Sequence, residues 1–234
     1  MKLSIVVPCY NEEKNIPLIL EKFKNIIKKE EIEVVLVNNG STDNSKDILE
    51  KLVPNYSFAR IVSVPKNKGY GYGIVQGLKE ANGDFIGWTH ADLQTDPFDV
   101  IKAYKIFEEK KWDKRIYIKG RRKKRTFIEN FFTIGMSIFE TFYLKEFLWD
   151  INGQPNLFSK NFFETWENPP KDFSLDLYAL FMAKKQKLDL VRINVLFPKR
   201  INGESSWNKG IMSRWKLSKR TLKFSLDLKK KGIK

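Results

Sequence analysis

The apolar positions in the first half of the chain follow two spacings that alternate along the sequence. Short continuous runs rich in Val and Ile predict strands at 3–7, 33–37, 60–64, 85–89 and 116–118. Between these runs, apolar residues recur every three or four positions, which predicts helices at 15–27, 41–52, 70–81 and 97–109. Repeated strand–helix units with short connections predict a mostly parallel sheet that helices cover on both faces. The first half therefore predicts an α/β fold.

The pattern changes after residue 120, where long aromatic-rich helical stretches begin and only one further strand is predicted, at 188–197. From Ile211 onward, basic and apolar residues fall on different faces of a predicted helix. The basic positions are 216, 219, 220 and 223, and the apolar positions are 211, 215, 222 and 226. We therefore expect a single Rossmann-like domain at 1–210, followed by a basic amphipathic helix at 211–234.

Composition restricts the partners of the chain. Among its 234 residues, Lys and Arg outnumber Asp and Glu by 43 to 28, which gives a formal net charge of +15. This balance predicts an anionic partner, such as a phosphorylated substrate, an acidic lipid or nucleic acid. The single cysteine, Cys9, excludes an internal disulfide and a Cys-based zinc site. No stretch approaches the ~20 uncharged apolar residues of a membrane span, so we expect a soluble or peripheral cytoplasmic protein.

Polar residues follow the predicted strands, most notably His90, Asp92 and Gln94 after the strand at 85–89. In an extended segment alternate residues point to the same side, so these three side chains would converge at the carboxyl end of a strand. Open α/β sheets bind their ligands there. Imidazole and oxygen ligands suit Mg²⁺ or Mn²⁺. The alternative is a polar turn in which Asp92 or Thr95 caps the following helix.

Five segments occur in an order and spacing that are known from other proteins. They are Ser4-Ile-Val-Val-Pro-Cys-Tyr-Asn-Glu-Glu13, Val37-Asn-Asn-Gly-Ser-Thr-Asp43, Asn67-Lys-Gly-Tyr-Gly-Tyr-Gly73, Gly83-Asp-Phe-Ile86 and His90-Ala-Asp92. Over roughly residues 3–100, the chain resembles family 2 glycosyltransferases with the glycosyltransferase-A fold. Asp92-Leu-Gln-Thr-Asp-Pro97 is similar to the dolichyl-phosphate mannose synthase branch. Gly120-Arg-Arg122 and Arg200-Ile-Asn-Gly-Glu-Ser205 fit that branch loosely.

The resemblance implies roles for the matching residues. Donor binding would fall to Pro8, Tyr10, Glu12, Asn39, Gly69 and Asp92, with Asn39 at the position that reads the nucleobase. A divalent cation, Mg²⁺ or Mn²⁺, would be held by Asp92, Gln94 and His90. Arg122 and Arg200 would contact phosphates, and Asp176 would be the candidate base. On the acceptor side stand Asp150, Asn152, Gln154 and Ser205, although a plain Asn-Gly turn at 152–153 is the alternative.

The chain departs from the family pattern at its acidic positions. His90 replaces the first Asp of the Asp-x-Asp motif, and Asn38 and Asn39 replace an Asp-Asp pair. The loss of these negative charges predicts a weaker grip on Mg²⁺. It favours Mn²⁺, which tolerates imidazole, or charge neutralisation by Arg and Lys. Leu175 replaces the acid before Asp176, so Asp176 is either a catalytic base or a residue on a helix face.

The resemblance and the charge balance together predict a reaction. A hydroxyl acceptor needs a base, whereas a phosphate monoester is already anionic near pH 7. We expect transfer of a hexose, mannose or glucose, with inversion, from a nucleoside-diphosphate sugar to a polyprenyl phosphate. One alternative is a family 2 transferase that extends a surface glycan at a hydroxyl. The other is a catalytically impaired module that binds a nucleotide sugar or RNA.

Two basic segments predict contact with an acidic membrane surface, at the inner face of the cell membrane. The run at 119–125 has six cations in seven residues and precedes an apolar stretch, and the second segment is the C-terminal helix. Cationic helices with aromatic and leucine faces lie in membrane interfaces. The alternative is a solvated basic face over helices packed on the core. Basic patches with aromatics also suit RNA, but no recognisable RNA motif accompanies them, so no nucleic acid partner is expected.

Overall fold

The computed structural model describes residues 2–28, 31–123, 127–198 and 211–230, with the backbone alone at 127–134, 136, 211–218 and 229–230. The strands are β1 Leu3–Cys9, β2 Ile32–Asn39, β3 Ala59–Val64, β4 Phe85–Trp88, β5 Ile116–Lys123, β6 Asn156–Ser159 and β7 Asp189–Leu196. The helices are α1 Ile16–Ile26, α2 Ser45–Leu52, α3 Tyr70–Glu80, α4 Phe98–Glu109, α5 Phe127–Leu144, α6 Lys160–Glu164, α7 Leu175–Lys185 and α8 Ile211–Lys230.

The strands form one seven-stranded sheet in the order β3-β2-β1-β4-β6-β5-β7. Strands β3, β2, β1 and β4 pair in parallel, and β5 pairs in parallel with β7. Strand β6 runs antiparallel to both of its neighbours, β4 and β5. The predicted mostly parallel sheet is confirmed, and its one reversed strand joins the two parallel groups.

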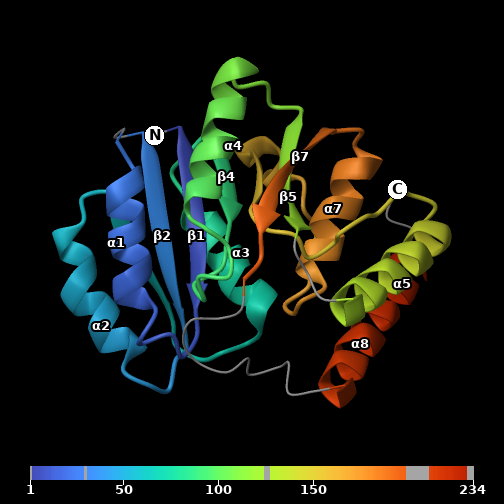
Figure 1. The fold of residues 1–234 in the computed structure, drawn as a ribbon, viewed down its shortest axis with the longest axis horizontal. Coiled ribbons are helices and arrows are strands. Elements are labelled where there is room, and N and C mark those ends of the chain that lie inside the picture. The colour runs from blue at the N-terminus through green and yellow to red at the C-terminus, as the bar shows by residue number, and fades with distance from the viewer. Residues whose placement is uncertain (1, 29–30, 124–126, 199–210, 231–234) are drawn as a thin grey trace.

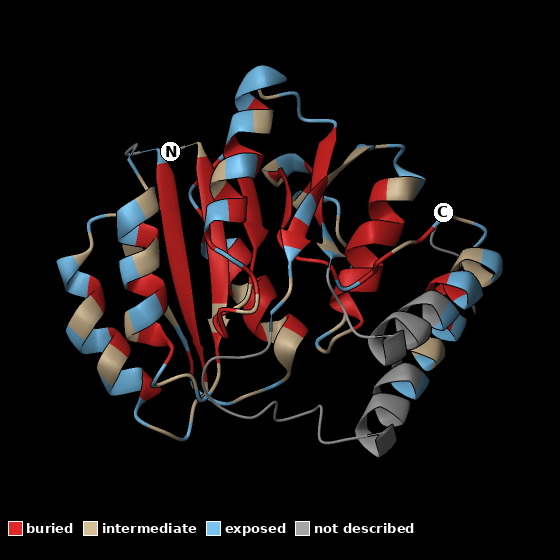
Figure 2. Cartoon of the chain, viewed as in Figure 1, coloured by how far each residue is buried: buried red, intermediate tan, exposed pale blue. Residues whose placement is uncertain are grey.

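Helices cover both faces of this sheet (Figures 1 and 2). On β1, Leu3, Ile5 and Val7 belong to the cluster that includes α1 and α4, whereas Val6 belongs to the cluster that includes α3 and α7. Strands buried on both faces need apolar side chains at successive positions. This explains why the sequence shows continuous apolar runs rather than alternation.

The structure differs from the sequence prediction at three elements. Strand β6 was not predicted, because it has only four residues and follows Pro155. Helix α2 begins at Ser45 instead of residue 41, because Ser41 and Thr42 bond to the loop after β1, while Asp43 accepts the backbone amide of Ser45 at 3.0 Å and that of Glu13 in the β1 loop. Strand β5 continues to Lys123, because its basic residues pair with β7 along the whole segment.

The C-terminal helix α8 lies beside α5 at the edge of the molecule (Figure 1). The Ser225 hydroxyl donates a hydrogen bond to the buried Glu140 carboxylate of α5, and Leu228 joins the core cluster that contains Tyr178 of α7. Helix α8 therefore packs on the α/β domain, and the boundary at residue 210 stays a prediction. Among the described residues, no helix combines the length and the apolar character that a membrane crossing requires.

Candidate active site

The loops that follow β1, β2 and β4 meet at one edge of the sheet, because these strands are parallel (Figure 1). Helix α3 begins at this edge with Tyr70, and α7 begins there with Leu175. The predicted site residues after the strands are therefore brought to the same side of the domain. The connection that leads into the reversed strand β6 reaches this edge too, since Gln154 bonds to Tyr70.

The first two loops are bound to each other around Asn11, which adopts a left-handed φ of 58°. The Thr42 backbone amide donates to Asn11 Oδ1 at 2.8 Å, and Asn11 Nδ2 donates to Thr42 Oγ1 at 3.2 Å. The Asn11 amide also donates to Ser41 Oγ at 3.2 Å. The predicted donor residues of this region, Pro8, Tyr10 and Glu12, are half-buried. These residues lie on a loop that is hydrogen-bonded to the loop after β2, so the two loops form one structural unit.

Asn39 ends β2 and is buried, with only 3% of its surface exposed. Its Nδ2 donates to the backbone carbonyl of Gly69 at 3.1 Å, and Gly69 holds a φ of 119° at the start of α3. Its Oδ1 is buried and has no hydrogen-bond partner within the described part of the chain. An unsatisfied buried acceptor costs about 1–3 kcal/mol. The position therefore suits a ligand that supplies an N–H donor.

The loop after β4 does not continue as an extended strand, so the predicted alternation of side chains through residue 94 is wrong. The strand ends at Trp88, and Leu93 has a φ of 58°. Asp92 is buried and its Oδ1 accepts the backbone amide of Gln94 at 3.0 Å, while Gln94 Nε2 donates to the carbonyl of Pro198 at 3.0 Å. The His90 ring lies 6.0 Å from that of Tyr70.

Helix α4 is capped by neither of the two residues that the sequence suggested, Asp92 and Thr95. Asp96 Oδ1 accepts the backbone amide of Phe98 at 3.0 Å, at the start of α4. Thr95 shares a hydroxyl–hydroxyl bond of 2.9 Å with Thr89 instead. Asp92 is therefore not needed to cap α4, and its buried carboxylate lies in the loop itself.

Asp176, in the first turn of α7, is the centre of a buried polar network. Its Oδ1 accepts Gln154 Nε2 at 2.6 Å and Asn156 Nδ2 at 3.1 Å. Gln154 Nε2 also donates to the Tyr70 hydroxyl at 3.2 Å. Burial raises the pKa of Asp176, although the charges of Lys119 and His90 oppose that rise. Burial of Tyr70 and the nearby charge of Asp176 raise the pKa of Tyr70 well above its ordinary value.

Arg122 and Asp150, predicted to serve phosphate and sugar separately, form an ion pair with each other. Arg122 Nε and Nη2 donate to Asp150 Oδ1 at 2.8 and 2.5 Å, and the Arg122 backbone amide donates to Asp150 Oδ2 at 2.7 Å. Their side chains are only 8% and 5% exposed. Burial disfavours the charge on Asp150, but attraction to Arg122 and its hydrogen bonds outweigh it and lower the pKa. The pair fixes the loop before β6 to β5.

The basic run of β5 is not a uniformly exposed patch. Lys119 is fully buried, Arg122 is held by Asp150, and Arg121 and Lys123 are exposed. Lys119 and Arg122 are therefore not available to a membrane surface, and the predicted membrane contact of this run stays a prediction. Gly120 in this run lets the loop before β6 approach, because a Cβ there would lie 1.9 Å from the carbonyl oxygen of Gln154.

Three further predicted residues take no described part in the network. Asn152 is exposed in the loop after α5. Arg200 and Ser205 lie outside the described residues. In turn, sequence reasoning missed Tyr70, Asn156 and Lys119 as members of the site. No motif marked Asn156, because its strand was not predicted, and Lys119 was counted only as one charge in a basic run.

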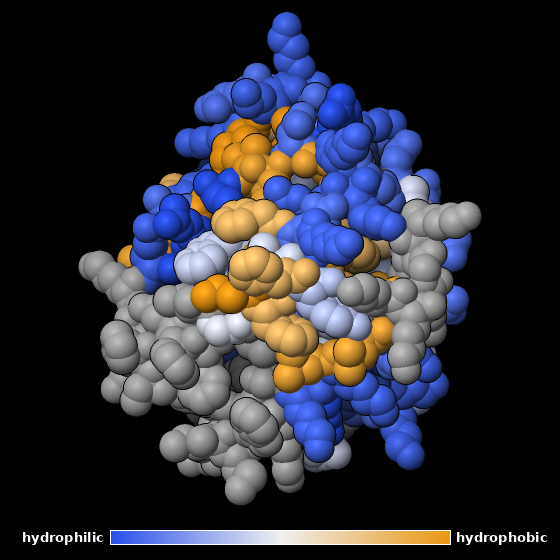
Figure 3. Space-filling view, turned by 90° about the vertical axis from the view of Figure 1, so that its right-hand side faces the viewer, coloured by the Kyte–Doolittle hydropathy of each residue, from blue (hydrophilic) through white to orange (hydrophobic). Residues whose placement is uncertain are grey.

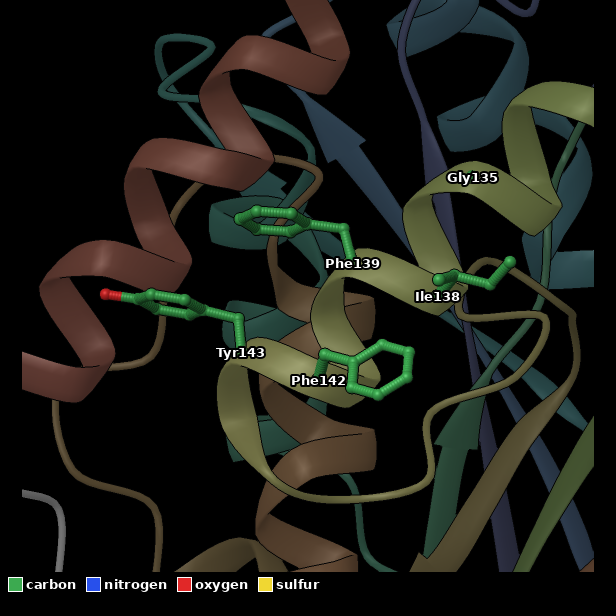
Figure 4. Close-up of a pocket in the computed structure, with 5 residues that line it drawn as sticks. All are labelled: Gly135, Ile138, Phe139, Phe142 and Tyr143. Atoms are coloured by element: carbon green, nitrogen blue, oxygen red, sulfur yellow. The ribbon is translucent and has the colours of Figure 1, made fainter.

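A second feature is a shallow apolar groove on α5, away from the sheet edge. Gly135, Ile138, Phe139, Phe142 and Tyr143 line it. Phe139 and Tyr143 point toward α8 and stack at 5.5 Å, whereas Ile138 and Phe142 point to the other side (Figure 4). Ile138 is 50% exposed and Phe142 is 80% exposed. The end of the molecule that carries α5 and α8 shows apolar residues interspersed with hydrophilic ones (Figure 3).

A comparison with protein families bears on what this arrangement does. The family model described as "Glycosyl transferase family 2" matches residues 4–167. The chain belongs to this family. The matched range includes the loops after β1, β2 and β4 and the whole of the segment from Arg122 to Asn156. The resemblance inferred from the sequence motifs is thereby confirmed.

Curated members of the family that are similar to this chain are named for transfer to polyprenyl phosphates. The undecaprenyl-phosphate 4-deoxy-4-formamido-L-arabinose transferase of Proteus mirabilis is 35% identical over 112 residues, which cover 46% of this chain and 34% of that protein. The dolichyl-phosphate beta-glucosyltransferase of Trichomonas vaginalis is 33% identical over 147 residues, 57% of this chain and 46% of that protein. The matched segment is thus less than half of either relative.

Solved structures share the fold. Glucosyl-3-phosphoglycerate synthase from Mycobacterium tuberculosis, in complex with Mn²⁺, uridine diphosphate and glucosyl-3-phosphoglycerate, matches with a TM-score of 0.67 at 16% identity. The match covers 96% of this chain and 78% of that one. A mannosyltransferase from Pyrobaculum calidifontis, in complex with GDP-mannose and Mn²⁺, has a TM-score of 0.70 at 16% identity, covering 100% and 65%. The predicted glycosyltransferase-A fold is confirmed.

The buried ion pair makes a prediction about stability. Asp150→Asn keeps the shape of the side chain but leaves the Arg122 guanidinium buried without its counter-charge. We expect the free energy of unfolding to fall by about 3 kcal/mol, as for other broken buried pairs. Urea denaturation measures this loss.

Asp99→Asn is the matched control, because Asp99 is equally buried but its partner Lys102 is 45% exposed. Solvent screening makes such a pair worth less than about 1 kcal/mol. If the free energy of unfolding fell equally in the two variants, the buried Arg122–Asp150 pair would contribute no more to stability than the partly exposed Lys102–Asp99 pair, which would contradict this account.

Proposed function

We propose that this chain transfers a hexose from a nucleoside-diphosphate sugar to a polyprenyl phosphate. The observation that carries the proposal is the convergence of Asp92, His90 and the Asp176 network around Tyr70, at the strand edge of a family 2 domain. The relatives named for undecaprenyl and dolichyl phosphate support the class of acceptor. Mannose or glucose is the favoured sugar, in keeping with the glucosyl and mannosyl transferases among the related proteins.

The donor would lie across the first two loops and the loop after β4. The unsatisfied Oδ1 of Asn39 fits an N–H group of the nucleobase, and the loop after β1, with Pro8, Tyr10 and Glu12, would form the other side of the base pocket. The diphosphate would extend from there toward Asp92. In this arrangement Asn39 does what an acidic residue does elsewhere in the family, by offering a neutral oxygen.

The residues that would hold a divalent cation are Asp92, His90 and Gln94, and the chemistry of their side chains is compatible with one. A carboxylate, an imidazole and an amide form a mixed set that suits Mn²⁺ better than Mg²⁺. The part of the chain that the structure describes has no cluster of three or more His, Cys, Asp or Glu side chains that would hold a metal. Donor phosphate oxygens would therefore complete the coordination. The bound cation would neutralise charge that develops on the leaving diphosphate.

The reaction would be a single displacement with inversion. An oxygen of the lipid phosphate forms the new bond to the anomeric carbon, the bond to the diphosphate oxygen breaks, and its electron pair leaves with the nucleoside diphosphate. Because the phosphate acceptor is already anionic near pH 7, no base has to remove a proton from it. Asp176 would then hold a sugar hydroxyl or the connection before β6 rather than accept a proton.

A hydroxyl acceptor is the second candidate, and the raised pKa of Asp176 favours it. A buried carboxylate with an elevated pKa is a better proton acceptor than an ordinary one, and a hydroxyl nucleophile needs such a base. Under this alternative the chain would extend a glycan, and Asp176 would be indispensable.

The groove on α5 supports contact with an acidic membrane surface, where the lipid acceptor would reside. Phe142 and, in the following loop, Phe147 are 80% and 67% exposed, and the exposed cation of Lys145 lies between them in sequence. On the neighbouring α8, Lys219, Arg220 and Lys223 are exposed. Exposed aromatics beside cations suit an interface with anionic lipid. The loop that follows α5 continues along the chain through Asp150 and Gln154, which bond to Arg122 and Asp176, so one segment connects the proposed membrane face to the polar network.

Donor binding is tested by the thermal stability of the protein. Uridine or guanosine diphosphate with Mn²⁺ should raise the melting temperature of the wild type, since ligand at a hundred times its Kd stabilises by about 2.7 kcal/mol. Asp92→Ala should lose the Mn²⁺-dependent part of this rise. The control is Asp96→Ala in the same loop, where the exposed carboxylate only caps α4. A full Mn²⁺-dependent rise in the Asp92 variant would remove Asp92 from the proposed site.

The two acceptor classes are separated by Asp176→Asn, which keeps the size of the side chain. Transfer to a polyprenyl phosphate should persist within about tenfold of the wild type, whereas loss of a general base costs about 10²–10⁴. The rate of radiolabelled sugar transfer into the lipid phase measures the difference. A transfer rate reduced more than a hundredfold, or transfer only to hydroxyl acceptors, would favour extension of a glycan as the reaction.

The membrane face is tested by vesicle co-sedimentation. The double variant Phe142→Ala and Phe147→Ala should bind anionic vesicles at least about tenfold more weakly, since burial of one aromatic side chain is worth about 1.5–3 kcal/mol. Phe98→Ala on α4, where Phe98 is 44% exposed, is the control and should bind as the wild type does. Equal binding by all three proteins would place the membrane contact elsewhere.

A further inference from the structure

A buried lysine adjoins the Asp176 network, and the proposed reaction gives it no role. Lys119 stands in the middle of β5 with none of its surface exposed, and it pairs across the sheet with Asn156 of β6. Its Nζ donates to Asn156 Oδ1 and, at 3.1 Å, to the carbonyl of Gly153. Both acceptors are neutral oxygens. A buried lysine that is not needed to neutralise a directly bonded carboxylate calls for another explanation.

Asn156 connects this lysine to Asp176. Its Oδ1 accepts Lys119 Nζ and, at 2.9 Å, the Tyr117 hydroxyl. Its Nδ2 donates to Asp176 Oδ1 at 3.1 Å and to Gln154 Oε1 at 2.7 Å. Each end of the amide is therefore bonded, and the two ends face groups of opposite character.

Lys119 and the Asp176 carboxylate favour the same orientation of the Asn156 amide, because an ammonium only donates and a carboxylate only accepts. A primary amide can turn over and exchange its oxygen and nitrogen. The Tyr117 hydroxyl does not prevent this exchange, because a hydroxyl can donate or accept. An ammonium can only donate, so Lys119 requires the amide oxygen on its own side. The Nδ2 group must then face Asp176.

The same orientation continues to the next residue of the network. Because Asn156 Nδ2 donates to Gln154 Oε1, the Gln154 amide must turn its Nε2 toward Asp176 and the Tyr70 hydroxyl. Both amides then direct donors at one carboxylate oxygen. If the Asn156 amide were reversed, its oxygen would face the Asp176 carboxylate. Two buried acceptor oxygens would then lie side by side with no hydrogen-bond donor between them.

We propose that Lys119 is a positioning residue, whose ammonium fixes the Asn156 and Gln154 amides so that both donate to Asp176. The value of this placement for catalysis rests on the proposed function, whereas the orientation of the amides does not. Lys119 reaches Asp176 through Asn156, and no step of the reaction requires it to touch substrate.

The charges that face Lys119 come from several elements. Asp176 of α7 and Asp150 of the loop before β6 favour its ammonium form, whereas Arg192 of β7 and Arg122 of β5 oppose it. Burial is the largest influence and lowers the pKa of Lys119 to about 7. As the pH rises through about 7, the neutral amine gains a lone pair and can accept a hydrogen bond. The constraint on Asn156 should therefore weaken on the alkaline side.

The test is the titration of Asp176, followed by the ¹³C resonance of its carboxyl group in protein labelled at aspartate. In Lys119→Met the proton affinity of Asp176 should rise about tenfold or more, since the donors and the nearby positive charge are lost together. The control is Lys160→Met, because Lys160 also donates to a backbone carbonyl, that of Ala81, but at a distance from the network. Unchanged titration of Asp176 in a folded Lys119→Met protein would overturn the proposal.

A second measurement needs no variant and no substrate. The side-chain amide resonances of Asn156 in the wild type should shift with the same midpoint as the ammonium of Lys119, and an Asn156 amide that ignores this titration would also overturn the proposal. In transfer assays, Lys119→Met should add no further loss to Asp176→Asn, because coupled residues are not additive. Additive losses would contradict action through Asp176. A protein without any transferase activity would leave both titrations measurable, so failure of the proposed function stays distinguishable.

Discussion

The hydrogen bonds that join Asp176 to Gln154 and Asn156 tie helix α7 to the start of strand β6. Strand β6 runs antiparallel to its neighbours, and within the described sheet it pairs with β4 of the four-stranded parallel group on one side and with β5 on the other. The residues at its start bond to α7 and, through Tyr70, to α3. The geometry of the site depends on this junction, because it fixes the acceptor-side loop relative to the loops that would bind the donor.

Most of the fold could be predicted from the sequence, because buried parallel strands need continuous apolar runs and the covering helices need apolar residues every three or four positions. The runs at 3–7 and 33–37 lie within β1 and β2, and the spacing at 15–27 marks α1. Strand β6 could not be predicted in this way. It owes its conformation to pairing with β4 and β5 on both sides rather than to a local pattern of its own four residues.

The site residues that belong to sequence motifs could be predicted, whereas those that tertiary packing brings into the site could not. The motifs identified Asp92, Asn39 and Asp176, and the structure brings each near the start of α3, where Asn39 bonds to Gly69 and Gln154 joins Tyr70 to Asp176. The pairing of Arg122 with Asp150 depends on the path of a loop that leaves α5 and returns to β6, and no spacing in the sequence encodes that path. Lys119 illustrates the same limit, since a charge within a basic run is ordinarily solvated, yet here its side chain turns inward between β5 and β6.

We propose that a nucleoside diphosphate binds between Asn39 and Asp92, at the carboxyl ends of the parallel strands. A crystal structure of the protein grown with Mn²⁺ and uridine or guanosine diphosphate tests this binding mode most directly. We expect the base to donate to Asn39 Oδ1, and the cation to be bound both by the diphosphate and by a carboxylate oxygen of Asp92. A nucleotide bound at the α5 groove, or a cation with no contact to Asp92, would contradict the account.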